Sequence, residues 1–392
     1  MRVQLYLWLL FQCCSAKVIQ IFVLWRHGDR APGELPYPSD AYNESFWPRG
    51  WDQLTEEGIR QTHSLGKWLR NKYVFENPLL SEEFNRKEIL FRSSNADRAI
   101  ESAQGVAAGL FPAKSSKIWA NPSDPVGWQP VPIFSATYGV EDPLLRPTGV
   151  ECPMVKALIN SRTESLAHSI NSEYRDLFQL LANHTGIPKI SFKNVKKLHG
   201  ITIEMLHDLE QPSWVFDLWN GSRIIDHIHE LKRINRLSNF DSKEKARVRA
   251  GFLLNDIAVN LEFTSRGLLT RKAFMYSSHD GTVNSLMYSL GIGNNLLVPY
   301  AAAVITEVHL EENQYFVRML YKNETDRSHS LILPGCSEVC PLTAFLNGIE
   351  SLRISSLQKV KEVCRLASST SSPTSSTTFV VLFVGIFAFL SL

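Results

Sequence analysis

Short apolar runs alternate along the chain with longer segments in which apolar residues recur every three or four positions. The runs predict buried strands at residues 19–25, 88–92, 274–277, 304–310 and 315–321. Four polar residues separate the last two runs, which indicates a hairpin. Helical periodicity marks residues 55–73, where Thr55 is a candidate N-cap, and residues 97–111.

The order of these elements predicts the fold class. Strand, helix, strand, helix is typical of an α/β fold with a largely parallel sheet and helices on both faces. From about residue 142 to 263 the strand signal fades and long helical patterns replace it. We therefore expect one domain over residues 17–365, with a core at about 17–141 and 264–365 and a mostly helical cap insertion at about 142–263.

Charged residues gather where three of the predicted strands end. They are Arg26, His27 and Arg30 after the first strand, Arg92 at the end of the second, and His279 with Asp280 after the third. In open α/β sheets, ligands bind beyond the carboxyl ends of the strands, so these residues are expected to converge.

The residue types in this group favour phosphate chemistry. The planar fork of arginine matches phosphate oxygens, so the three arginines predict a dianion receptor. Gly28 has no side chain and could let the backbone approach the anion. Neighbouring arginines disfavour imidazolium, which keeps His27 neutral and nucleophilic, and Asp280 can protonate the leaving oxygen.

Other motifs have simpler interpretations. Alone, Arg-His-Gly-x-Arg is more often surface salt bridging than catalysis, and only the matching strand ends reverse that balance. The pair His207-Asp208 lies in the helical region, which indicates a solvated helix position. The segment "DHIHE" at 226–230 suggests a metal site, but its alternating His227 and His229 do not share a helical face. His63, in the first helix, is interpreted as structural.

Composition limits the partners. The 392 residues contain 41 Lys and Arg against 39 Asp and Glu, and the basic residues are scattered. This balance gives no support to nucleic acid as a partner, because binding to a phosphate backbone needs a basic field.

The beginning of the chain and its cysteines indicate secretion. Residues 1–16 have the charge and apolar run of a signal peptide, and its removal leaves four cysteines. In an oxidising compartment an even set favours disulfides over metal ligands. Cys336 and Cys340 suit a local bridge, which leaves Cys152 with Cys364. The candidate glycosylation sites are Asn43, Asn183, Asn220 and Asn323.

The end of the chain predicts a membrane signal. A Ser/Thr-rich spacer at 366–378 precedes fourteen largely apolar residues at 379–392, with no basic residue after them. A spanning helix needs about 20 apolar residues, so this tail favours a GPI signal over a single-pass type I helix. Either anchor places the domain at the cell surface or in a lumen.

Three segments carry a resemblance to a known family. "RHGDRAP" resembles the RHGxRxP signature of the histidine acid phosphatases, "FRSSNADRAIESA" is similar to their second arginine segment, and "MYSSHDGTV" to their His-Asp segment. The similarity spans most of residues 18–365, and three segments in order make it highly specific.

The resemblance implies an acid phosphatase that hydrolyses small phosphomonoesters through a phosphohistidine. In it His27 is the nucleophile, Asp280 the proton donor, and Arg26, Arg30, Arg92 and His279 bind phosphate. No metal or other cofactor is implied, and animal members are commonly homodimers. Two alternatives stay open: a non-catalytic ectoprotein that binds phosphorylated ligands, and a phytase or phosphomutase. The near-neutral charge argues mildly against a phytase.

Overall fold

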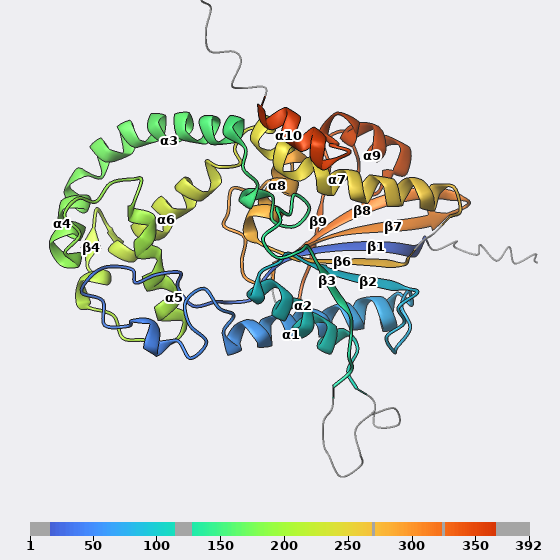
Figure 1. Ribbon diagram of the computed structural model, residues 1–392, viewed down its shortest axis with the longest axis horizontal. Helices are drawn as coiled ribbons and strands as arrows, with labels where there is room; N and C mark the ends of the chain where they lie inside the picture. The colour runs from blue at the N-terminus through green and yellow to red at the C-terminus, as the bar shows by residue number, and fades with distance from the viewer. Residues whose placement is uncertain (1–15, 114–127, 269–270, 324–325, 366–392) are drawn as a thin grey trace, which may run out of the picture.

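The computed structural model describes residues 16–113, 128–268, 271–323 and 326–365. Its centre is one mixed sheet in the order β10-β8-β7-β1-β6-β2-β3, with β9 beside β8 (Figure 1). The strands are β1 (Lys17–Arg26), β2 (Ile89–Ser93), β3 (Ile133–Ser135), β6 (Ala273–Ser278), β7 (Ala303–Glu311), β8 (Gln314–Lys322), β9 (His329–Leu331) and β10 (Cys340–Pro341).

The sheet has a parallel half and an antiparallel half. Strands β1, β6, β2 and β3 run parallel, as the sequence predicts. Beyond β1 the β7–β8 hairpin, also predicted, adds antiparallel strands. The parallel half brings the carboxyl ends of β1, β2 and β6 to one edge of the sheet, which Figure 1 shows facing the cap helices.

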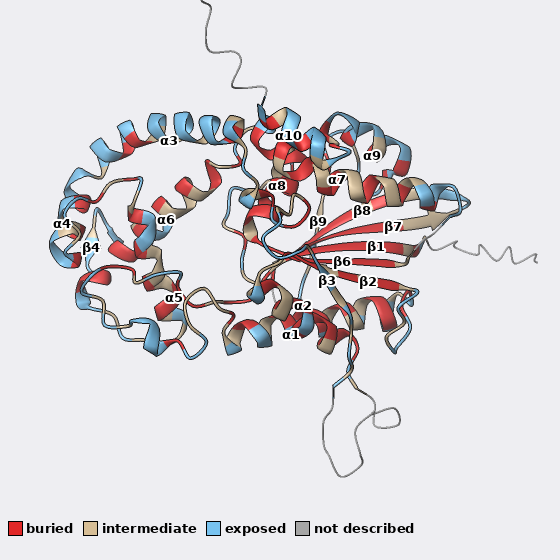
Figure 2. Ribbon diagram, in the orientation of Figure 1, coloured by how far each residue is buried: buried red, intermediate tan, exposed pale blue. Residues whose placement is uncertain are grey.

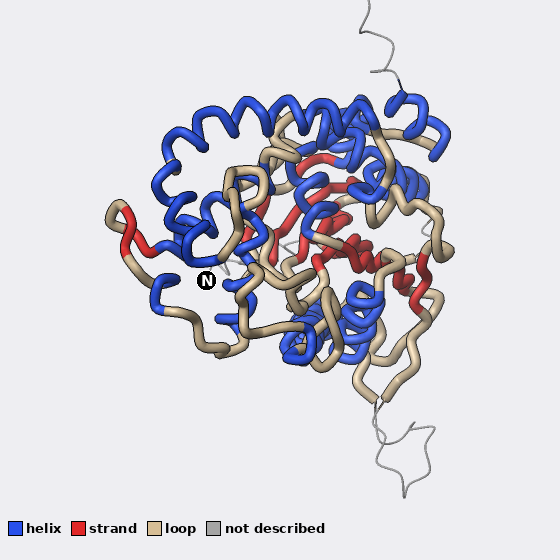
Figure 3. The backbone as a smooth tube through the Cα atoms, turned by 60° about the vertical axis from the view of Figure 1, so that its left-hand side comes forward, coloured by secondary structure: helices blue, strands red, loops and turns tan. Residues whose placement is uncertain are grey.

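The apolar run of β1 is explained by burial on both of its faces. Phe22 and Leu24 pack into one cluster with helices α7, α8 and α9, whereas Val23 and Trp25 pack into another with α1 and α2. Side chains alternate between the faces of a strand, so a strand covered on both sides is apolar at nearly every position. Figure 3 shows the strands with helices on either side.

Helices lie at the two core positions that the sequence predicts, and further helices complete the core. In the core they are α1 (Glu56–Arg70), α2 (Asp97–Leu110), α7 (Lys243–Ser265), α8 (Asp280–Ser289), α9 (Leu342–Ile349) and α10 (Leu357–Arg365). Thr55 caps α1 as expected, because its hydroxyl accepts a hydrogen bond from the Gly58 amide at 3.1 Å.

The cap is a separate helical layer with its own core. It contains α3 (Pro153–Glu173), α4 (Arg175–Thr185), the 3₁₀ turn η5 (Val195–His199), α5 (Gly200–Leu206), α6 (Ile224–Leu237) and the short ribbon β4 (Leu218–Trp219) with β5 (Ser222–Arg223). Its apolar cluster draws on these helices and on Tyr37 from the loop after β1. Figure 2 shows the long α3 largely exposed along the outside.

One boundary of the cap differs from the expectation. Helix α7 was placed in the cap by its sequence, but Leu253, Leu254 and Ile257 belong to the cluster that covers the sheet. A buried helix without a strand signal looks the same in sequence whether it covers a sheet or another helix. In the structure α7 belongs to the core.

Both predicted disulfides are present. Cys152 joins Cys364 across a sequence separation of 212, and Cys336 joins Cys340 across a separation of four. The first ties the start of α3 to α10 and so fastens the cap to the core. Asn43, Asn183 and Asn220 are exposed and Asn323 is partly buried. Their glycosylation stays a prediction.

The predicted signal peptide lies almost entirely, and the predicted membrane tail wholly, outside the described residues. Within the part of the chain that the structure describes, no helix has the length and apolar character to cross a bilayer.

Candidate active site

The loop after β1 begins the site. The amide of His27 donates to the Ser278 carbonyl of β6 at 2.9 Å, and the His27 carbonyl accepts from the Ala301 amide at 3.1 Å. Gly28 follows; its approach to an anion stays a prediction, and the structure shows a steric reason for the glycine. A Cβ there would lie 2.2 Å from the Gly58 carbonyl oxygen, so the glycine admits the first turn of α1.

The hydrogen bonding of His27 fixes which nitrogen can react. Its Nδ1 lies 2.8 Å from the Gly28 carbonyl oxygen, and because a carbonyl only accepts, Nδ1 carries the proton. Nε2 therefore carries the lone pair, which accepts a hydrogen bond from Arg98 Nε. Burial, the Arg26 charge and then His279 and Arg98 lower the pKa of His27 well below its usual value, so the ring stays neutral.

The second arginine beside His27 is Arg98, which the sequence analysis did not select. It lies in the first turn of α2, and its Nε is 3.3 Å from His27 Nε2. Arg92, the residue expected there, lies within β2, opposite Tyr276 of β6 in the register of the sheet. Its charge lowers the pKa values of Tyr276 and Asp142. Arg98 thus takes the place predicted for Arg92.

The remaining predicted arginines are held by their neighbours. Arg26 donates to the Val298 carbonyl at 2.6 Å, and its guanidinium lies 3.8 Å from the centre of the Tyr300 ring. Arg30 pairs with Asp52 at 2.9 Å. A carboxylate and an aromatic face fix the direction of a guanidinium, so less rotamer freedom is lost when an anion binds.

His279 lies at the end of β6 and faces His27 edge to face, with 5.4 Å between the ring centres. Its Nε2 is 2.8 Å from the Ser94 hydroxyl, which follows β2. Burial and the Arg98 charge lower the pKa of His279 to about 3. The ring is therefore neutral, and a bound phosphate would favour its protonated form.

Asp280, the first residue of α8, forms an ion pair that the sequence analysis missed. Its oxygens accept from Arg236 at 2.7 and 2.9 Å. Burial alone raises the pKa of Asp280, but the charges of Arg236 and Arg26 outweigh it and hold that pKa well below its usual range. Arg236 comes from cap helix α6, and no motif in the sequence marks it.

Comparison with known proteins shows the family of the chain. The model of the histidine phosphatase superfamily (branch 2) matches residues 17–322. This chain belongs to that superfamily. It is 34% identical to bovine prostatic acid phosphatase over 330 residues, which cover 83% of each chain. It is 33% identical to human lysosomal acid phosphatase over 362 residues, which cover 89% of this chain and 80% of the relative.

Solved structures of low identity share the fold of this histidine phosphatase. The phytase of Citrobacter braakii superposes with a TM-score of 0.65 at 16% identity and covers 88% of this chain and 99% of its own. Hafnia alvei phytase in complex with myo-inositol hexakis sulphate gives a TM-score of 0.65 at 16% identity and covers 89% and 98%. These likenesses confirm the α/β core with its helices.

Two of the other histidine motifs can now be placed in this histidine phosphatase. The interpretation of His207 as a solvated helix position was wrong, because its Nε2 lies 2.6 Å from Oδ2 of the buried Asp29. It joins the cap to the loop that carries His27. His227 and His229 have separate partners, since His227 contacts Trp219 whereas His229 faces His199.

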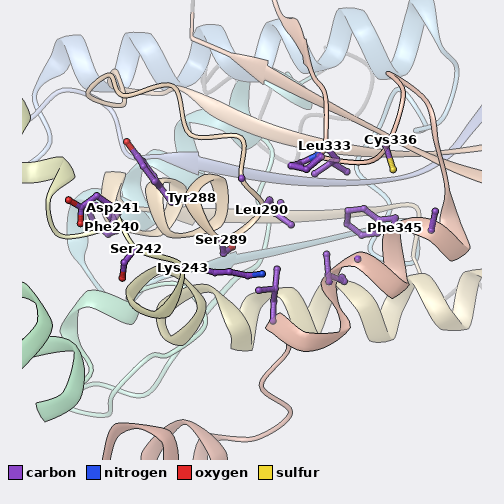
Figure 4. A pocket seen from close by; sticks show the side chains of 16 residues that line it. Phe240, Asp241, Ser242, Lys243, Tyr288, Ser289, Leu290, Leu333, Cys336 and Phe345 are labelled. Carbon is purple, nitrogen blue, oxygen red and sulfur yellow. The ribbon is translucent and has the colours of Figure 1, made fainter. Parts of the chain in front are cut away.

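A cavity of about 390 Å³ lies away from this group of side chains. It opens between the start of α7, the end of α8 and α9, and its lining includes Phe240, Tyr288, Leu333 and Phe345 (Figure 4). His27 and Asp280 are not among the described residues that line it.

Proposed function

We propose that this chain is an acid phosphatase that hydrolyses phosphomonoesters through a covalent phosphohistidine at His27. The observation that carries the proposal is the state of the His27 ring. Nδ1 donates a hydrogen bond to the Gly28 carbonyl, and the lone pair of Nε2 accepts one from Arg98 Nε at 3.3 Å, a donor that a bound phosphate would take over. Family membership and the acid phosphatases that the chain resembles support the same reaction class.

In the first step Nε2 of His27 attacks phosphorus and the ester P–O bond breaks. Arg26, Arg30 and Arg98 bind the equatorial oxygens, where the planar guanidinium groups stabilise the developing charge. His279 donates to the same group once the phosphate raises its pKa. Asp280 protonates the leaving oxygen.

For this role Asp280 must first gain a proton. In the free enzyme its pair with Arg236 holds it ionised. A bound phosphate dianion competes for Arg236 and adds negative charge, and both effects raise the pKa of Asp280. Mildly acidic solution then supplies the proton, which accounts for an acidic optimum of roughly pH 4 to 6.

In the second step water replaces His27 on phosphorus. The Asp280 carboxylate takes a proton from the attacking water, the N–P bond breaks, and inorganic phosphate leaves with the ring neutral again. Each proton that Asp280 gives in the first step returns in the second, so the cycle closes without a cofactor.

The proposal extends to the setting of the enzyme. The two disulfides fit an oxidising compartment, which supports passage through the secretory pathway. Glycosylation at the four sequons, a membrane anchor in the C-terminal segment and a homodimer are further parts of the proposal, taken from the sequence and from the family.

Hydrolysis of a chromogenic phosphomonoester in mildly acidic buffer with a chelator tests the proposal. We expect turnover by the intact protein and a loss of about a thousandfold or more in His27→Ala. Activity that survives in His27→Ala, or that disappears with the chelator, would contradict the histidine mechanism.

A further inference from the structure

Cap helix α6 presents a row of basic side chains to the sheet edge. His229, Lys232 and Arg236 are three and four residues apart, a spacing that places them on one helical face. Arg236 reaches Asp280, so this face is turned toward the site. The apolar residues Ile224, Ile228 and Leu231 face the core of the cap.

A second cap element meets this row. The ring of His199, from η5, lies 5.6 Å from the ring of His229. Its Nδ1 is buried without a hydrogen-bond partner among the described residues. The charges of Lys232 on the cap and of Arg26 and Arg30 on the core all contribute to lowering the pKa of His199.

The positive charge of this group is only partly compensated. Among the described residues Lys232 forms no ion pair, and the nearby Asp280 is already engaged by Arg236. Burial and the Arg236 charge lower the pKa of Lys232 to about 8, and burial with the Lys232 charge lowers that of His199 to about 3. Lys232 is therefore charged in mildly acidic solution, and an anion would relieve the repulsion that it feels.

The spacing of Lys232 and Arg236 along the helix indicates how far apart two anionic groups of a substrate would lie. Lys232 precedes Arg236 by four residues, which is about 6 Å along an α-helix. A phosphate bound at Arg236 and His27 would therefore lie about one helical turn from Lys232, whose side chain could contact another group of the substrate.

We propose that Lys232, His199 and His229 form a second anion subsite, which selects phosphomonoesters that carry another carboxylate or phosphate about one ring width from the scissile phosphate. This inference rests on the proposed phosphatase function and adds the substrate class. The inference does not conflict with the near-neutral formal net charge of +2, because a local group of basic side chains can bind an anion whatever the charge of the whole chain.

A pair of substrates that differ in one charge tests the subsite. We would compare kcat/KM for 4-carboxyphenyl phosphate with kcat/KM for its neutral amide, 4-carbamoylphenyl phosphate, in the full chain. The ratio of the two values should fall about tenfold in Lys232→Gln, because a charge-assisted contact to the carboxylate is lost. Lys232→Arg should keep most of the ratio.

Lys193→Gln is the matched control. Lys193 lies on the same cap layer but is exposed and pairs with Glu164, so its replacement should leave the ratio within about twofold. The amide substrate, measured on each preparation, shows whether the variant is folded and active. An equal loss on both substrates in Lys232→Gln, or no change in the ratio, would overturn the subsite. No hydrolysis of either substrate by the unmodified chain would instead overturn the proposed function.

Discussion

The sheet edge and the cap face that covers it both carry positive charge, but they hold it differently. At the edge, Arg30 is paired with Asp52, Arg26 lies on the Tyr300 ring and donates to a carbonyl, and the His27 ring is fixed through Gly28. On the cap, Lys232 forms no ion pair among the described residues, although the charge of Asp280 acts on it. The edge is thus preorganised, whereas on the cap Arg236 is paired with Asp280 and Lys232 has no ion pair among the described residues.

The difference separates two tasks. Preorganised groups stabilise charge in a transition state without reorganisation, which suits the reacting phosphate. A charged side chain without an ion pair, such as Lys232, can bind an anionic group of the substrate, which suits selection among substrates. Arg236 belongs to both regions, since it lies on the cap helix and reaches the Asp280 carboxylate of the core.

The largest expected effect concerns the attachment of the cap. Replacing Cys152 and Cys364 by alanine should lower the free energy of unfolding by about 5 kcal/mol, because the bond closes a loop of 212 residues in the unfolded chain. Chemical denaturation under non-reducing conditions measures this change.

The double replacement of Cys336 and Cys340 by alanine is the matched control for the free energy of unfolding. This bond spans four positions, so its removal should cost only about 2 kcal/mol in the loop-entropy model. Similar losses for the two pairs would show that the cap is held by packing and not by the tether at α3.

A smaller effect, about 3 to 4 kcal/mol in transition-state stabilisation, is expected at the edge. Arg98→Ala should lower kcat/KM by about a hundredfold to a thousandfold, because Arg98 lies against the reactive nitrogen. Arg92→Ala should cost less than about tenfold, since Arg92 acts on Tyr276 and Asp142. Steady-state kinetics on one aryl phosphate compares them. A larger loss of kcat/KM in Arg92→Ala than in Arg98→Ala would show that Arg92, and not Arg98, binds the phosphate.

The smallest of these effects tests the link between the regions. Arg236→Gln removes the charge that lowers the Asp280 pKa, so that pKa rises and Asp280 stays protonated to higher pH. We expect kcat/KM to fall about tenfold at its optimum and the optimum itself to move upward. Arg233→Gln, on the same helix but paired with Glu230, should not move the profile. An unmoved optimum in Arg236→Gln would show that Asp280 does not set it.

Most residues at the sheet edge could be predicted from the sequence, because the order of the parallel strands determines where their ends lie. Apolar runs located β1, β2 and β6, and the carboxyl ends of parallel strands meet at one edge wherever the loops lead. His27, His279 and Asp280 directly follow those strands, so their convergence follows from topology.

The rule fails for residues that are set by loop and cap geometry. It locates the loop after β2 but does not choose between Arg92, inside the strand, and Arg98, in the first turn of α2. Helix N-termini that follow such strands lie at the same edge, and this signal could have identified Arg98. For Arg236 and His207 no local pattern exists, because the docking of the cap brings them to residues 44 and 178 positions away.

The most direct test of the central claim is the site of phosphorylation itself. Turnover of a labelled phosphomonoester would be stopped with alkali, which preserves an acid-labile phosphohistidine, and the peptide that contains His27 would be mapped. Because Nδ1 donates a hydrogen bond to the Gly28 carbonyl, the phosphoryl group should be found on Nε2 of His27. No label should be found in His27→Ala. Label on Nδ1, on another residue, or retained in His27→Ala would contradict the mechanism.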